Sequence, residues 1–260
     1  MTCACREIDL RKLNSLTKYP SIPTLHEMGE RGRLGPLAVH FPEDEPVFVS
    51  EKIDGANARV VVLPGGHWLI GSREEFLAHE TDLLWSPAER IVEALRPRVT
   101  ALAANSGAEG LVVWYGEVYG AKVGAGAKNY TGGNGLGFRV FDIMFLPTEE
   151  MNDVLTRPVE DIAWWREGDG QQFEDVDSIK RLSERAECEH VPALPEARAH
   201  LCGTHEEALA NLRALLPESL AALDDGAKKR PEGVVFRTYN REVIAKARFE
   251  DYERATKGPA

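Results

Sequence analysis

Hydrophobic and polar residues alternate along seven short runs of the chain, each bounded by glycine, proline or asparagine. Runs rich in β-branched and aromatic side chains with this period are typical of β-strands. The predicted strands cover residues 46–51, 58–63, 67–71, 110–119, 138–146, 232–238 and 242–248. The pattern therefore favours a largely antiparallel sheet system.

Helical patterns are fewer. Ser86 is followed by a proline and, three residues on, by a glutamate, which predicts the start of an amphipathic helix that Pro97 interrupts. Thr204 and Glu207 have the spacing of a capping box and predict a second helix that ends near Pro217.

Residues 124–137 contain six glycines and no apolar periodicity. Glycine is unfavourable inside helices and strands, so this segment is predicted to be a mobile loop between two strands. The spacing of a P-loop is absent around Lys128.

Charge is unevenly distributed along the 260 residues, whose formal net charge is -11. Residues 149–225 hold 19 acidic and 7 basic residues, a charge of -12, so the rest of the chain carries +1. We expect 149–225 to form a peripheral helical segment, and a surface that binds nucleic acid remains possible elsewhere. The stretch 226–248 is basic, with seven lysines and arginines against two glutamates.

No run of about 18 uncharged apolar residues occurs, and the charged first residues do not resemble a secretory signal. The four cysteines are too few and too unevenly spaced for a disulfide framework. We therefore expect no membrane association and a cytoplasmic protein with reduced thiols. Cys188, His190, Cys202 and His205 could supply four zinc ligands, but their spacing is unusual for zinc, and ordinary core or surface roles are favoured.

Candidate chemistry begins at Lys52, which follows a predicted strand directly and precedes a tight turn at Asp54 and Gly55. Lys246 and Arg248 alternate along the last predicted strand, so both point to one face of it. If that face lines a cleft, these cations would favour a neutral, nucleophilic Lys52 and would neutralise phosphate charge. Further short elements follow Lys52 in order: Gly71 to Arg73, Tyr115 to Gly120, Phe138 to Ile143, Glu232 to Arg237 and Ile244 to Arg248.

This ordered set resembles the covalent nucleotidyltransferase superfamily of ATP-dependent polynucleotide ligases and capping enzymes, and more narrowly the RNA ligases of the phage and RNA-editing type. The resemblance implies an α+β fold, a ligase-type nucleotidyltransferase domain whose antiparallel β-sheets form an ATP cleft flanked by helices. It also implies a reaction in three steps: a lysine takes AMP from ATP, AMP passes to a 5′-phosphate end, and a 3′-hydroxyl displaces AMP to seal RNA. ATP and Mg²⁺ or Mn²⁺ are the implied cofactors, and RNA repair is the implied role.

The resemblance also assigns residues. The implied catalytic residues are Lys52, Glu232, Lys246 and Arg248. The implied nucleotide-binding residues are Glu51, Asn57, Arg73, Glu117, Phe141 and Lys246. Glu117 and Glu232 are the implied metal ligands. The family pattern has lysine where this chain has Arg248, which leaves the role of Arg248 open.

Only twelve residues follow Arg248, too few for the oligonucleotide-binding (OB) barrel that DNA ligases and capping enzymes carry after this motif. We therefore expect residues 1–260 to form a single nucleotidyltransferase domain without an OB-fold domain, which favours an RNA-type ligase and leaves room for a trans-acting RNA-binding protein as a partner. Two other functions stay open. One is a minimal DNA ligase or a partner-dependent polynucleotide 5′-adenylyltransferase, and the other is a non-catalytic module that binds nucleotides or RNA ends.

Overall fold

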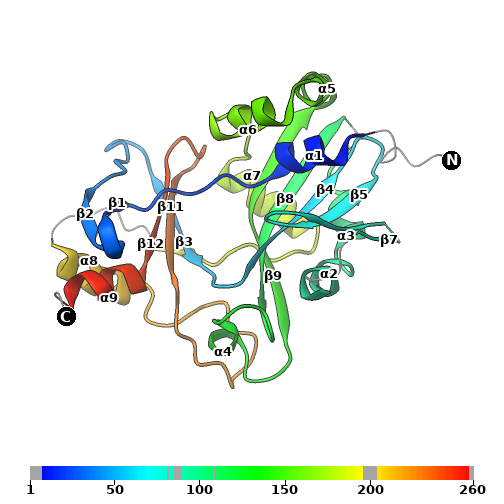
Figure 1. Cartoon of the computed structure of the whole chain (residues 1–260). Coiled ribbons are helices and arrows are strands. Elements are labelled where there is room, and N and C mark those ends of the chain that lie inside the picture. The colour runs from blue at the N-terminus through cyan, green and yellow to red at the C-terminus, as the bar shows by residue number, and fades with distance from the viewer. Residues whose placement is uncertain (1–7, 81, 85–88, 108, 196–203, 258–260) are drawn as a thin grey trace. The chain divides into compact units, whose positions relative to one another are not determined.

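The computed structural model describes residues 8–80, 82–84, 89–107, 109–195 and 204–257. The chain folds into two compact units, each assembled from three separate segments (Figure 1). Unit 1 comprises Met1–Pro20, Ala56–Val118 and Leu136–His190, and unit 2 comprises Ser21–Gly55, Tyr119–Gly135 and Val191–Ala260.

Unit 2 is built on a four-stranded antiparallel sheet with strand order β10-β3-β11-β12. Its strands are β3 (Val47–Lys52), β10 (Ala193–Leu194), β11 (Gly233–Thr238) and β12 (Ile244–Arg248), and a separate pair is formed by β1 (His26–Met28) and β2 (Leu34–Leu37). The helices of the unit are η2 (Glu30–Gly32), α4 (Ala127–Tyr130), α8 (His205–Leu215) and α9 (Phe249–Thr256). Helices α8 and α9 pack against each other, and α9 also contacts β12 and β2.

The two faces of the sheet in unit 2 have different chemistry. Val49 of β3 lies opposite Phe236 of β11, which lies opposite Ala245 of β12. These residues are buried in one apolar cluster with Leu209 of α8 and Tyr252 of α9. Side chains alternate across a sheet, so the opposite face carries the residues between them.

Unit 1 is built on a six-stranded sheet with strand order β7-β6-β5-β4-β8-β9. The strands are β4 (Ala56–Val62), β5 (Trp68–Ser72), β6 (Phe76–His79), β7 (Asp82–Leu83), β8 (Gly110–Gly120) and β9 (Leu136–Pro147). The helices are α1 (Leu10–Thr17), α2 (Glu89–Leu95), α3 (Val99–Ala104), α5 (Thr148–Thr156), α6 (Val159–Glu167) and α7 (Val176–Arg185). Helix α2 contacts β4, β5 and β9, α3 contacts β4, α5 and α7 contact β9, and α1 packs against α5 and α6.

The seven predicted strands are confirmed as β3, β4, β5, β8, β9, β11 and β12, to within two residues at either end. The predicted helix break at Pro97 separates α2 from α3, whereas the predicted start at Ser86 lies outside the described residues. The capping box of Thr204 and Glu207 is present at the start of α8. Helices α5 to α8 fall within or next to the acidic segment 149–225, three of them in unit 1 and one in unit 2.

The glycine-rich segment 124–137, predicted to be a mobile loop, has more regular structure than expected. It contains helix α4, and its backbone is tied to residues 223–229. The Leu223 and Lys228 N–H groups donate to the Tyr130 and Lys128 carbonyls at 2.7 and 2.9 Å. The glycine content did not indicate helix α4. The hydrogen bonds that hold the segment come from residues about 95 positions further along the chain, which no local pattern predicts.

Candidate active site

Lys52 is the last residue of β3, and the sheet register fixes its neighbours. Gly233 of β11 lies opposite both Lys52 and Arg248 of β12. Directly opposed residues point to the same side of a sheet, so Lys52 and Arg248 flank the space above Gly233. A side chain at Gly233 would collide with the backbone of Ala247 and Arg248, so only glycine fits here.

Glu232, the residue before β11, accepts a hydrogen bond from Lys52. Lys52 Nζ and Glu232 Oε2 are 2.6 Å apart, and both side chains are about three-quarters buried, with exposed fractions of 27% and 21%. Burial raises the pKa of the Glu232 carboxyl above its ordinary value, although the charge and hydrogen bond of Lys52 partly offset this. The pair therefore places a proton acceptor directly on the amine of Lys52.

Lys246 and Arg248 share the face of the sheet on which Lys52 lies, as their alternation predicted. Arg248 also contacts helix α9: its Nε and Nη2 each donate a hydrogen bond to the Asp251 carboxylate at 2.8 Å. These hydrogen bonds raise the pKa of Arg248, and Asp251 is almost fully buried. The carboxylate at the start of α9 thus fixes the direction of the guanidinium.

Glu51 does not share this face. Strand alternation turns its side chain to the apolar side of the sheet, where it is 1% exposed. Its carboxylate accepts hydrogen bonds from the Ser219 hydroxyl and from the Leu220 backbone N–H, the latter at 2.8 Å. Glu51 thus ties the end of β3 to residues 219–220, and its contact with the nucleotide stays a prediction.

Tyr130 of α4 supports the turn after Lys52, a role that sequence reasoning missed. The Asp54 N–H donates to the Tyr130 hydroxyl at 2.6 Å, and the Tyr130 ring packs edge-on against Tyr119 with centroids 5.1 Å apart. Burial raises the pKa of Tyr130, so its hydroxyl stays protonated. Gly126 lies so close to Asp54 that a Cβ there would collide with the carboxylate.

Asp224 holds the other end of the same glycine-rich segment. Its carboxylate accepts hydrogen bonds from the Thr131 hydroxyl and from the Gly132 N–H, the latter at 2.8 Å. The backbone N–H of Gly132 is the largest cause that lowers the pKa of Asp224. In the sequence, Tyr130 and Thr131 stand out from the glycines around them. Neither residue indicates that it contacts Asp54 or Asp224.

Asn57, Arg73, Glu117 and Phe141 belong to unit 1. Asn57 of β4 lies directly opposite Glu117 of β8, so their side chains share one face of the six-stranded sheet. The Asn57 Oδ1 atom is buried and accepts no hydrogen bond from the described residues. Such an atom is costly unless a donor reaches it, which makes Asn57 a candidate to contact a ligand.

Phe141 of β9 is half-buried and packs edge-on against Tyr19, with ring centroids 4.9 Å apart. The Tyr19 hydroxyl donates to Asp142 at 2.7 Å, which fixes the ring that supports Phe141. Phe138 is buried, as expected for the opposite face of the strand. Arg73 follows β5, and half of its side chain is exposed.

Within the described part of the chain, no group of three or more histidine, cysteine or acidic residues is arranged to hold a metal ion. Of the cysteine and histidine group, Cys188 is a buried free thiol and Cys202 lies outside the described residues. No described helix is both long enough and apolar enough to cross a membrane.

A sequence profile described as RNA ligase matches residues 45–249, which include every candidate residue from Glu51 to Arg248. No curated protein sequence matches the chain significantly. Among solved structures, a Naegleria gruberi RNA ligase mutant with ATP and Mn is 17% identical, has a TM-score of 0.54, and aligns over 95% of this chain and 63% of its own. Another mutant of that ligase, with AMP and Mn, gives 17% identity, a TM-score of 0.53, and coverage of 92% and 64%. The chain thus spans less than two thirds of these solved ligases, and the likeness confirms the predicted α+β fold of ligase-type nucleotidyltransferases.

Proposed function

The chain belongs to the RNA ligase family, and from this premise we propose that it is an ATP-dependent RNA ligase that works through a covalent AMP on Lys52. Its substrates are RNA ends with a 5′-phosphate and a 3′-hydroxyl, as a break in an RNA strand presents them. The pairing of Lys52 with Glu232 at 2.6 Å, on a sheet face shared with Lys246 and Arg248, is the observation that supports this proposal best.

In the first step the neutral Lys52 amine attacks the α-phosphorus of ATP, and the proton that the nitrogen releases passes to Glu232. A P–N bond forms, the bond to the bridging oxygen breaks, and pyrophosphate leaves. In the second step a 5′-phosphate oxygen of RNA attacks the phosphorus of AMP, the P–N bond breaks, and Lys52 recovers its proton from Glu232. In the third step the 3′-hydroxyl oxygen attacks the activated 5′-phosphorus and releases its proton to solvent, the bond from that phosphorus to AMP breaks, AMP leaves, and the strand is sealed.

Lys246 and Arg248 are proposed to stabilise charge on the phosphates. Two cations on one face of a strand, preorganised by the sheet and, for Arg248, by Asp251, suit charge that develops as the α-phosphate is attacked. In unit 1, Phe141 is proposed to stack on adenine, Glu117 to bind the ribose, and Asn57 and Arg73 to contact phosphate or ribose. The unsatisfied Asn57 Oδ1 supports a ligand contact at that position.

Single carboxylates suit a divalent metal that arrives with the substrate. Mg²⁺ usually keeps waters and is held by one or two carboxylates together with substrate phosphates. Glu117 and Glu232 are the proposed carboxylates, and the described residues offer no larger cluster. When bound, Mg²⁺ or Mn²⁺ would neutralise phosphate charge.

A strand-joining assay tests the proposal. RNA with a labelled 5′-phosphate is incubated with ATP and Mg²⁺, and the ligated product is separated by size. We expect joining by the wild-type protein, none by Lys52→Ala, and normal joining by Lys180→Ala, which removes an exposed lysine of α7. Equal joining of DNA and RNA would favour a DNA ligase, and no joining with intact ATP binding would favour a binding module.

A further inference from the structure

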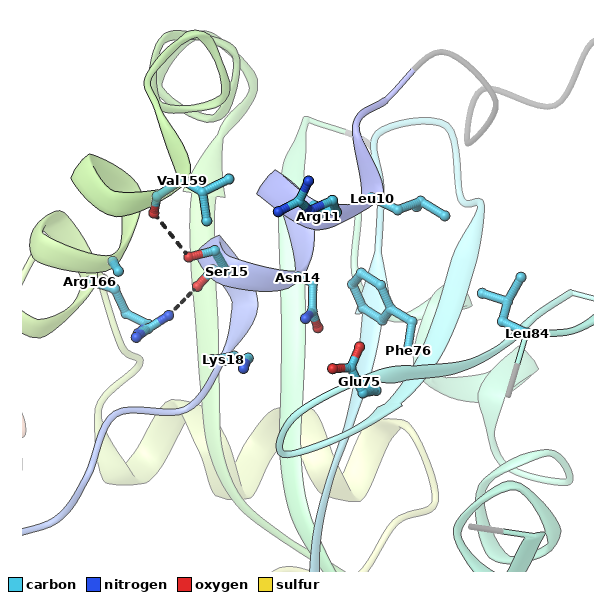
Figure 2. Close-up of a pocket in the computed structure, with 11 residues that line it drawn as sticks. Leu10, Arg11, Asn14, Ser15, Lys18, Glu75, Phe76, Leu84, Val159 and Arg166 are labelled. Atoms are coloured by element: carbon cyan, nitrogen blue, oxygen red, sulfur yellow. Dashed lines mark hydrogen bonds between the residues drawn. The ribbon is translucent and has the colours of Figure 1, made fainter. Parts of the chain in front are cut away.

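A pocket of about 530 Å³ lies entirely within unit 1, lined by helices α1 and α6 and by the turn from β5 to β6 (Figure 2). None of the residues assigned above to ATP or to catalysis lines it. Pockets for small organic ligands have volumes of roughly 300 to 1,000 Å³, so the space suits one nucleotide.

The lining combines apolar, cationic and anionic side chains. Leu10, Phe76 and Leu84 supply apolar surface, and Arg11 and Lys18 supply positive charge (Figure 2). Lys18 is paired with Glu74 at 2.6 Å, whereas exposed Arg11 makes no ion pair with a described residue. Arg11 is thus available to an anion from solution.

The wall between α1 and α6 is fixed by hydrogen bonds. Arg166 of α6 donates to the Ser15 carbonyl of α1, and the Ser15 hydroxyl donates to the Val159 carbonyl at 3.5 Å (Figure 2). Arg166 also pairs with Glu167 at 2.9 Å, and only 11% of its side chain is exposed. A preformed wall lowers the entropy lost when a ligand is ordered against it.

Arg59 of β4 does not line the pocket but contacts two residues that do, and it is fully buried. Its Nη2 donates to Asn14, and its guanidinium lies 5.0 Å from the centroid of the Phe76 ring. Asn14 and Phe76 both line the pocket, and the Asn14 amide also donates to the Glu74 carbonyl at 2.8 Å. Burial lowers the pKa of Arg59 to about 10, so the group remains charged at neutral pH.

The hydrogen bonding of this buried guanidinium is incomplete. The Nε and Nη1 atoms of Arg59 have no hydrogen-bond partner among the described residues. A buried cation with unsatisfied N–H groups is costly, and an anion bound on the other side of Asn14 and Phe76 would offset part of that cost.

We propose that the pocket binds one nucleotide, with its base against Leu10, Phe76 and Leu84, its phosphate at Arg11 and its ribose hydroxyls at Glu75. Glu75 is the one acidic residue in the described lining, and it would repel a bare phosphate. A nucleotide uses all three kinds of side chain, because its base is apolar on both faces, its ribose donates hydrogen bonds and its phosphate is anionic. The nucleotide comes either free from solution or as part of an RNA strand, and only the RNA source rests on the proposed function.

Binding is measured by fluorescence anisotropy with a labelled 5′-phosphorylated RNA 12-mer, and by equilibrium dialysis with UMP, which avoids an adenine site. For Arg11→Glu we expect RNA affinity to fall about fivefold to tenfold, and the slope of log K against log salt to lose about 0.7, the value of one single-strand phosphate. Arg181→Glu, which reverses the charge of an exposed arginine of α7, is the matched control and should leave both quantities unchanged.

The source of the nucleotide follows from the second probe. A parallel loss of UMP affinity in Arg11→Glu identifies a free nucleotide as a ligand, and a loss for RNA alone identifies a strand. Unchanged binding of both probes overturns the proposal. Self-adenylylation with ATP, measured on the same variants, should not change, so a failure of the pocket is distinguishable from a failure of the ligase chemistry.

Glu75→Gln tests the ribose contact independently. We expect the ratio of its RNA affinity to its DNA affinity, measured with 12-mers of the same sequence, to fall about fivefold, because the lost charge acts on both strands whereas only RNA has a 2′-hydroxyl. An equal change for RNA and DNA, or no change for either, would contradict a ribose contact at Glu75.

Discussion

The two units differ in how completely they satisfy their own buried polar groups. In unit 2, Lys52 is paired with Glu232, Arg248 with Asp251, and Glu51 with Ser219 and Leu220. Every buried side-chain polar atom without a hydrogen-bond partner in the described part of the chain belongs to unit 1: Asn57 Oδ1, Arg59 Nε and Nη1, Gln171 Oε1 and Ser183 Oγ. Unit 2 thus holds its reactive side chains by internal contacts, whereas unit 1 leaves polar groups that ligands could complete.

The largest effect is expected at the Lys52–Glu232 pair. Glu232→Gln keeps the shape of the side chain but removes the proton acceptor, so the rate of AMP incorporation from ATP should fall about a hundredfold. Glu253→Gln is the matched control, since Glu253 pairs with the exposed Arg213 and Arg230. An unchanged rate in Glu232→Gln would rule out this acceptor.

The pH dependence of the adenylylation rate also tests whether Glu232 is the proton acceptor. Burial raises the pKa of Glu232, so its carboxylate takes up a proton at a higher pH than an ordinary glutamate. The acceptor is present above that raised pKa and is lost as the pH falls through it, so the acid limb of adenylylation should lie above about pH 4.5. Glu232→Gln should lack this limb, and an identical limb in both proteins would assign it to another group.

Breaking an ion pair of unit 2 should cost stability. Arg248→Met leaves the buried Asp251 carboxylate without its main partner, so the free energy of unfolding should fall by about 3 kcal/mol in urea titrations. Arg157→Met breaks the exposed pair with Asp153 and should cost less than about 1 kcal/mol. Equal costs would mean that burial of Asp251 adds nothing to the pair.

Tyr130→Phe should have a smaller effect. It removes the acceptor of the Asp54 N–H, which should lower the free energy of unfolding by about 1 to 2 kcal/mol. Adenylylation should slow about tenfold, because the turn after Lys52 loses a fixed contact. Tyr239→Phe, at a partly exposed tyrosine, is the control. A stability loss without a slower reaction would make Tyr130 purely structural.

The smallest expected change in the free energy of unfolding is an increase, in contrast to the losses above. Arg59→Met replaces a buried, incompletely paired cation in unit 1, so the free energy of unfolding should rise by about 1 kcal/mol. The same variant should bind RNA more weakly than the wild type if the pocket takes a nucleotide. A loss of more than about 2 kcal/mol in urea titrations would show that Arg59 is well compensated, and would remove the contrast between the units.

Alternation and capping predicted the longer elements, because those signals are local. Helices α1 and α9 were missed although Asp9 caps α1 and Phe249 and Tyr252 of α9 are buried, since both helices have only eight residues. The period of a strand also predicts that Glu51 points away from the face that Lys52 occupies, as the structure has it.

Contacts between distant residues could not be predicted from the sequence. Asp54 and Tyr130 are 76 positions apart, and Glu51 and Ser219 are 168 apart. Neither pair has a local pattern, and only the fold brings them together. The ligase motifs identified candidate residues, but the partners that fix their direction, such as Asp251 and Tyr130, required the structure.

Intact mass spectrometry of the protein after incubation with ATP and Mg²⁺, followed by peptide mapping, tests the covalent role of Lys52 most directly. We predict the gain of one AMP, located on Lys52 and absent from Lys52→Ala. AMP on another residue, or no gain with ATP, GTP or NAD, would contradict the proposed chemistry.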